Sequence, residues 1–135
     1  MSQIVKATCD CGAVEVTMNT PPMMAAFCHC EDCRELLNVP YHSLAVWSDP
    51  EAVQITKGQD DITEFQHPTK RMTRVYCNHC GESMYNTNSQ GWRLASQLLI
   101  RKNNNSELPE GFEPTKHFFY DRRIVDIDDD LPQYG

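Results

Sequence analysis

Seven cysteines are the residues of this chain best suited to chemistry, and they fall in three tight clusters. The clusters read Cys9-x-Cys11, Cys28-x-Cys30-x-x-Cys33 and Cys77-x-x-Cys80. Each spacing allows neighbouring thiolates to share one metal ion, and several thiolates together favour zinc. Four plus three is the natural division of seven. It predicts one closed site that stabilises the fold and one open site that keeps a position for water or substrate.

Disulfides are the alternative interpretation, and three features disfavour them. Seven is odd, so complete pairing would leave one thiol over. A bridge between residues two apart, such as Cys9 and Cys11, would close a small and strained ring. Residues 1–6 contain no apolar run long enough for a signal peptide, so we expect a cytoplasmic protein in a reducing compartment.

Composition bounds the class of protein. A chain of 135 residues is expected to form one domain, residues 1–135, with a modest core. A hydrophobic fraction of 40% and a mean hydropathy of -0.55 predict a globule without a membrane span. The net charge of -7 opposes binding to phosphate backbones, so nucleic acid is not expected as a partner.

Short strands and turns are expected rather than long helices, and the predicted class is mostly β. Alternating or apolar runs bounded by turn residues predict strands at 13–18, 23–27, 43–47, 52–56, 62–65 and 71–76. A short helical turn is predicted at 31–37. Residues 96–101 fit either a strand or a helix, and the polar segment 102–114 predicts a surface loop.

Local geometry suggests which clusters belong together. Residues two apart on a strand share a face, so Cys9 and Cys11 should point the same way, as should Cys28 and Cys30. Residues 77–81 fit a zinc knuckle, a tight turn in which a glycine supplies permissive backbone. The favoured assignment joins the first and last clusters in a four-thiolate site and leaves the middle cluster as a complete open site. The competing assignment pairs the last cluster with two cysteines of the middle one.

The triad of Cys28, Cys30 and Cys33 is the candidate reactive site. Free N–H groups at the start of the predicted helix would stabilise its thiolates. A zinc held by three thiolates carries net charge -1, which suits it to binding an incoming thiol as thiolate more than to strong Lewis-acid chemistry. The alternative is a second structural zinc closed by a histidine from elsewhere: His29, His42 or His117.

The order of these motifs resembles a known family. The motifs are Cys9-x-Cys11-Gly12, Cys28-His29-Cys30-x-x-Cys33-Arg34, Tyr76-Cys77-x-x-Cys80-Gly81 and the C-terminal Lys116-His117-Phe118-Phe119 and Asp129-Asp130-Leu131-Pro132-Gln133-Tyr134. They resemble the glutathione-dependent formaldehyde-activating enzyme family, which is shared with centromere protein V. The chain departs from the family pattern at residues 36–40, Tyr76 and Glu82, positions that the resemblance places near the substrate pocket.

The resemblance implies a β-tent fold, related to Mss4-like domains, with two zinc ions. One zinc would be structural, on Cys9, Cys11, Cys77 and Cys80. The other would be catalytic, on Cys28, Cys30 and Cys33. The implied activity is carbon–sulfur lyase chemistry, in which formaldehyde and glutathione condense to S-hydroxymethylglutathione and the reaction reverses. The implied partner is glutathione or a related small thiol. A zinc-stabilised binding module without catalytic activity is the alternative function.

Several other residues carry weaker expectations. His29 and His79 lie between metal ligands and should point away from the metal, toward solvent or supporting groups. His117 is expected to be a satisfied core histidine, and residues 126–130 a solvated acidic segment. Four aromatic residues are expected in the core: Trp47, Trp92, Phe118 and Phe119. Five cations could bind the carboxylates of a glutathione-like ligand, although scattered surface cations are the default: Lys70, Arg71, Arg74, Arg122 and Arg123.

Overall fold

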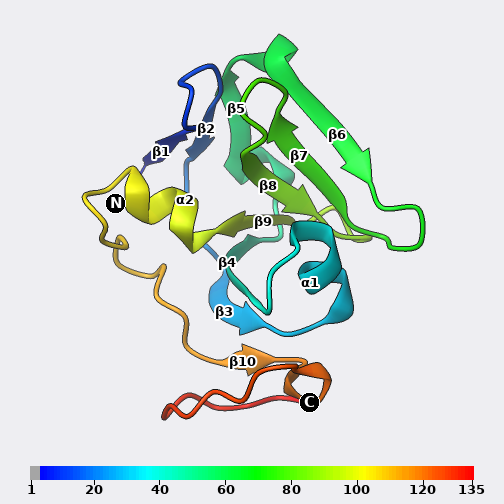
Figure 1. The fold of residues 1–135 in the computed structure, drawn as a ribbon. Helices are drawn as coiled ribbons and strands as arrows, with labels where there is room; N and C mark the ends of the chain where they lie inside the picture. The colour runs from blue at the N-terminus through cyan, green and yellow to red at the C-terminus, as the bar shows by residue number, and fades with distance from the viewer. Residues whose placement is uncertain (1–3) are drawn as a thin grey trace.

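Two β-sheets form the frame of the computed structural model, which describes residues 4–135 (Figure 1). The smaller sheet has three strands in the order β1-β2-β5, and both pairings are antiparallel. Its strands are β1 (Val5–Thr8), β2 (Glu15–Met18) and β5 (Val53–Lys57). Along β2, Val16 and Met18 are buried while their neighbours are less so, which is the alternation expected when one face of a sheet covers a core.

The larger sheet has seven strands in the order β10-β3-β4-β9-β8-β7-β6. Its strands are β3 (Met24–Cys28), β4 (His42–Trp47), β6 (Ile62–Gln66), β7 (Thr73–Cys77), β8 (Ser83–Thr87), β9 (Arg93–Ser96) and β10 (His117–Phe118). Neighbouring strands are antiparallel except β10, which lies parallel to β3 at the edge of the sheet. Figure 1 shows β10 and the C-terminal segment running below β3.

Two short helices follow strands of the larger sheet. Helix α1 (Glu31–Leu37) begins after Cys30, whose sulfur accepts a hydrogen bond from the Cys33 N–H, and ends at Asn38 in the left-handed conformation. Helix α2 (Gln97–Lys102) begins after Ser96, whose hydroxyl caps the Leu98 N–H. Single 3₁₀ turns occur at η1 (Pro50–Ala52), η2 (Gln59–Asp61) and η3 (Tyr120–Arg122).

The apolar side chains form two clusters. The larger one includes Trp47, Met84 and Phe112, all almost fully buried. The smaller one lies against α1 and includes Leu36 and Leu44 together with two cysteines of the triad. Each fully buried side chain of this size contributes about 1.5–3 kcal/mol, so the smaller cluster fixes α1, and with it the triad, on the sheet.

The mostly β class is confirmed, and the helix at 31–37 has the predicted bounds. All six predicted strands overlap observed ones. The ambiguous segment 96–101 forms the end of β9 and most of α2, and the predicted loop at 102–114 also contains a buried phenylalanine. Strands β1, β8 and β9 were not predicted as separate elements. Within residues 4–135 no helix has the length and apolar character that a membrane span requires. A single domain over residues 1–135 stays a prediction.

Candidate metal centres

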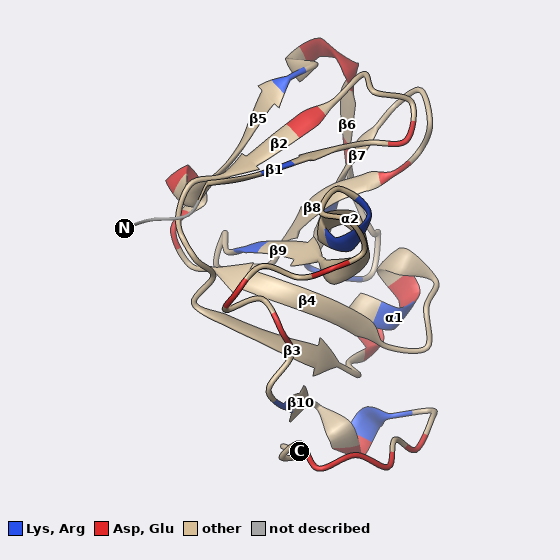
Figure 2. Ribbon diagram, turned by 90° about the vertical axis from the view of Figure 1, so that its left-hand side faces the viewer, with Lys and Arg blue, Asp and Glu red and all other residues tan. Residues whose placement is uncertain are grey.

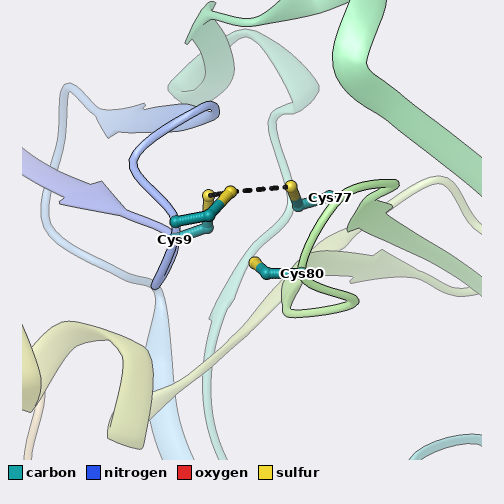
Figure 3. Close-up of side chains that lie close together, drawn as sticks. Cys9, Cys77 and Cys80 are labelled. Atoms are coloured by element: carbon teal, nitrogen blue, oxygen red, sulfur yellow. Dashed lines mark hydrogen bonds between the residues drawn. The ribbon is translucent and has the colours of Figure 1, made fainter.

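Four cysteines from distant parts of the chain converge at one point. The Sγ atoms of Cys9, Cys11, Cys77 and Cys80 all lie within 4.8 Å of one another. Figure 3 shows the sulfurs of Cys77 and Cys80 directed toward Cys9. The Cys9–Cys11 and Cys11–Cys77 sulfur pairs are each 3.6 Å apart. Sulfurs at tetrahedral corners roughly 2.3 Å from one zinc would be roughly 3.8 Å apart, so donor type and spacing fit that metal.

The first arm of this cluster is a turn, not a strand. Strand β1 ends at Thr8, and the Gly12 N–H donates to the Cys9 carbonyl at 3.0 Å. Gly12 has φ 82°, a conformation that costs a glycine little. The expectation that Cys9 and Cys11 share a strand face was therefore wrong, although the turn still places their sulfurs together.

The second arm is the predicted knuckle. It follows β7, and the Gly81 N–H donates to the Cys77 carbonyl at 2.8 Å. The His79 N–H lies 3.4 Å from the Cys77 sulfur, a contact that favours a thiolate. The His79 ring points away from the cluster, as predicted, and its Nε2 lies 2.8 Å from a carboxylate oxygen of Asp61.

A lysine from α2 joins the two arms. The Lys102 ammonium lies 2.7 Å from a carboxylate oxygen of Asp10 and also contacts Glu82. The Asp10 N–H in turn donates to Glu82 at 2.8 Å. Burial alone would lower the pKa of Lys102, but these hydrogen bonds raise it, so the ammonium stays charged between the two arms. No local sequence pattern marks Lys102, because its partner Asp10 lies 92 residues away.

The middle cluster forms a separate triad. The sulfurs of Cys28, Cys30 and Cys33 lie within 4.8 Å of one another, with Cys28 and Cys30 3.3 Å apart. Cys28 ends β3, Cys30 precedes α1 and Cys33 lies in its first turn, so the strand-to-helix junction builds the triad. No histidine or carboxylate of residues 4–135 joins the three sulfurs within the same distance. The geometry therefore does not favour the alternative of a site closed by a histidine.

The triad concentrates negative charge on one sulfur. Hydrogen bonds from Cys28 and Cys33 lower the pKa of Cys30 to about 2. The same interaction raises the pKa of Cys28 to about 12, and hydrogen bonds with its two neighbours raise the pKa of Cys33. An anionic sulfur at the start of a helix is the arrangement expected of a cation-binding or nucleophilic cysteine site.

A buried chain of hydrogen bonds supports the triad from behind. His29 and His117 are both fully buried, and the His29 Nε2 lies 3.0 Å from the His117 Nδ1. Burial lowers the pKa of His29. The His117 Nε2 reaches Asp129 at 2.9 Å. His117 is therefore the satisfied core histidine that was expected, and His29 contacts a supporting group rather than solvent, which is one of the two orientations expected of it. Figure 2 shows the acidic run after β10, of which Asp129 is tied to the interior rather than freely solvated.

Most cations proposed for ligand carboxylates already have partners. Lys70 lies 3.3 Å from Glu35, and Arg122 lies 3.8 Å from Glu31. Arg123 pairs with Asp126, and Arg74 stacks on the Tyr76 ring while contacting the knuckle carbonyl of Gly81. Among residues 4–135 only Arg71 of these five has no ion pair or stacking contact.

A cavity of about 260 Å³ with a mixed polar and apolar lining adjoins β4, the strand that pairs with β3. His42, which pairs directly with Cys28 across β3 and β4, lines this cavity together with Asn86. Both side chains are buried, yet neither ring nitrogen of His42 nor the Asn86 Oδ1 has a hydrogen-bond partner among residues 4–135. Burial lowers the pKa of His42 to about 4, so its ring is neutral at pH 7. Orphaned buried polar atoms facing a cavity are typical of a ligand site.

A second, apolar cavity of about 320 Å³ reaches the triad itself. Cys28 lines it, and the other lining residues are Met24, Leu44, Val46, Asn88, Trp92, Leu94, Phe118 and Phe119. The core expectation holds for Trp47, which is buried, whereas Trp92 and Phe118 are only half-buried. It was wrong for Phe119, which is 50% exposed.

Comparison with known proteins agrees with this architecture. Residues 4–122 match the family model described as glutathione-dependent formaldehyde-activating enzyme. Among solved structures, the crystal structure of a Rhodobacter sphaeroides protein matches with TM-score 0.55 and 18% identity, covering 97% of this chain and 100% of that chain. That likeness establishes a shared fold, and a comparison with curated proteins gave no match. The family match spans both cysteine clusters and most of the sequence, and the chain therefore belongs to the glutathione-dependent formaldehyde-activating enzyme family.

Proposed function

We propose that the protein is a zinc-dependent carbon–sulfur lyase that adds glutathione, or a related thiol, to formaldehyde and reverses the addition. In the forward direction the thiol sulfur bonds to the carbonyl carbon, the C=O π bond breaks and the thiol proton ends on the oxygen. The observation that carries this proposal is a cysteine triad to which residues 4–135 add no fourth ligand, with Cys28 lining one cavity and its cross-strand partner His42 lining another, in a member of this family.

The two clusters would have different roles. Cys9, Cys11, Cys77 and Cys80 would hold a structural zinc, because four thiolates close a tetrahedral site. Cys28, Cys30 and Cys33 would hold a second, catalytic zinc. When bound there, zinc would stabilise an incoming thiol as thiolate near neutral pH. Two ions per chain follow from this assignment.

The residues around the triad would position the thiol substrate. The neutral ring of His42 offers one N–H donor and one nitrogen acceptor, and Asn86 offers an unpartnered carbonyl oxygen. A peptide thiol such as glutathione carries matching amide donors and acceptors. We assign the cavity lined by His42 and Asn86 to the peptide part of the thiol, with its sulfur at the triad.

Calorimetry with glutathione and S-methylglutathione at two pH values tests the proposal. Glutathione binding should release a proton, so its affinity should rise roughly tenfold per pH unit below the thiol pKa. S-methylglutathione, which cannot form a thiolate, should bind far more weakly and without this pH dependence. His42→Leu should weaken glutathione binding by roughly 5- to 100-fold, as expected for loss of a buried hydrogen bond. His79→Leu, which changes a histidine beside the four-cysteine cluster instead, is the matched control.

Equal affinity for the two ligands, with no proton release, would contradict the proposal. The non-catalytic binding module would then be the better description.

A further inference from the structure

We propose that the apolar cavity beside Cys28 binds the hydrocarbon group of an aldehyde substrate larger than formaldehyde. The preferred reaction would join a glutathione-like thiol to an aliphatic or aromatic aldehyde of roughly six to eight carbons. The thiol R′SH and the aldehyde RCHO give R′S–CH(OH)R, with the thiol proton on the new hydroxyl. This inference rests on the proposed function and names its substrate class.

The position of the cavity connects it to the reacting atoms. Cys28 belongs to the triad and also lines the cavity. Met24 pairs with Val46 across β3 and β4, and Val46 pairs with Leu94 across β4 and β9. Residues paired across antiparallel strands share a face, so this apolar floor runs along the sheet from the triad outward. When the aldehyde carbon bonds to a thiol sulfur held at the triad, the hydrocarbon group on that carbon would therefore extend over the floor.

The volume of the cavity exceeds what formaldehyde requires. Formaldehyde has two heavy atoms, whereas a cavity of roughly 150 Å³ accommodates benzene. The cavity here is about 320 Å³, at the lower end of the range for small-molecule sites. With formaldehyde alone, water would have to cover most of the apolar walls, so a hydrocarbon group is the better occupant.

Phe119 gives an independent reason to expect a ligand. Its backbone has φ 56° and ψ 37°, a left-handed conformation that is rare for a bulky side chain. The residue is also 50% exposed while lining the cavity. Both the strained backbone and the exposed ring are unfavourable for the protein alone, and such strain is concentrated at functional sites. Burial of the ring against an apolar ligand would offset this cost.

Binding of unreactive alcohols tests the cavity without the thiol reaction. In the metal-loaded protein, affinity should rise about fourfold for each methylene added from ethanol to 1-hexanol. The rate enhancement over the uncatalysed thiol addition should likewise be larger for hexanal than for formaldehyde. A flat alcohol series, together with a larger enhancement for formaldehyde, would overturn the inference.

Two variants locate the effect. Phe119→Gly suits the left-handed backbone and should lower the hexanol-to-ethanol affinity ratio about tenfold, whereas Phe65→Ala, at a 45% exposed phenylalanine on β6, should not. Met24→Phe fills the floor and should exclude hexanol while ethanol still binds. An unchanged ratio in both variants would place alcohol binding elsewhere and overturn the assignment.

The inference and the proposed function can fail separately. Chain-length-dependent alcohol binding without glutathione binding would support the cavity assignment and remove the proposed thiol chemistry. Glutathione binding with proton release, but no chain-length dependence, would support the thiol chemistry and overturn the cavity assignment.

Discussion

The His29 Nε2 lies 3.0 Å from the His117 Nδ1, and both rings are buried inside the protein. In the sequence, His29 stands between Cys28 and Cys30 of the triad. His117 is in turn hydrogen-bonded to Asp129. One tautomer pattern satisfies both contacts: His117 donates from Nε2 to the carboxylate and accepts at Nδ1 from the His29 Nε2–H. The ring between Cys28 and Cys30 is thereby fixed by a carboxylate of the C-terminal segment.

Asp129→Ala should loosen this segment from β3. The substitution removes the acceptor of the buried His117 Nε2–H, the side-chain hydrogen bond that joins this segment to β10. Hydrogen exchange at the His29 amide, which donates to the Phe118 carbonyl, should become faster. Asp130→Ala, at an exposed neighbouring residue, is the control. Equal exchange in both variants would mean that Asp129 does not hold the segment.

The same contact predicts an acid dependence. The hydrogen bond from His117 lowers the pKa of Asp129 below its usual value of 3.8, so the folded state favours the carboxylate. Its stabilising contribution is complete above that usual value and is lost as the pH falls through the lowered one. The difference in unfolding free energy between the wild type and Asp129→Ala should therefore shrink below about pH 3.8. Denaturant titrations at several pH values measure it. A difference that grows on acidification would contradict this sign.

Serine substitutions should separate the roles of the two clusters. Cys77→Ser should prevent folding, because binding of a structural zinc contributes on the order of 10 kcal/mol of folding free energy. Cys30→Ser should remove one zinc and leave a folded protein. Circular dichroism combined with elemental mass spectrometry measures fold and metal content. One zinc per wild-type chain, or the same collapse in both variants, would contradict the assignment.

Lys102→Met should weaken the four-cysteine cluster. The substitution removes the cation shared by Asp10 and Glu82, which links the two arms of the cluster. Because the pair is partly exposed, the expected loss is about 0.5–1 kcal/mol, or a fall in Tm of about 2–5 °C. Transfer of metal to a chromogenic chelator should also be faster than in Lys6→Met, a control on the exposed side of β1. Equal transfer rates in the two variants would show that Lys102 does not protect the metal.

Short-range patterns predicted the parts of the molecule that depend on neighbours in sequence. The cysteine spacings and the helix after Cys30 are of this kind. The expected strand geometry at Cys9 and Cys11 was wrong, yet the sulfurs still meet because a tight turn also brings residues two apart together. Local spacing therefore identified candidate ligands better than it identified the backbone that holds them.

Features built by distant pairings could not be read from the sequence. Strand β10 has only two residues and is defined by its parallel pairing with β3. The contacts of Lys102 with Asp10 and of Asp129 with His117 likewise join residues that only the folded chain brings together. The exposure of Phe119 depends on a left-handed backbone conformation that propensity does not predict for a bulky residue. The two cavities likewise arise only once residues from several strands far apart in the sequence are assembled.

The distance of 88 residues between His29 and its partner His117 also has a consequence for synthesis. All four cysteines of the first cluster have been synthesised once residue 80 is added, but the histidine behind the triad follows 37 residues later. At about 5–20 residues per second, this interval is roughly 2–7 s. The residues of the four-cysteine cluster are therefore complete first, while the triad, although made earlier, still lacks β10, the strand that pairs with β3. The order of strands along the chain therefore sets the order in which the two clusters reach their final form.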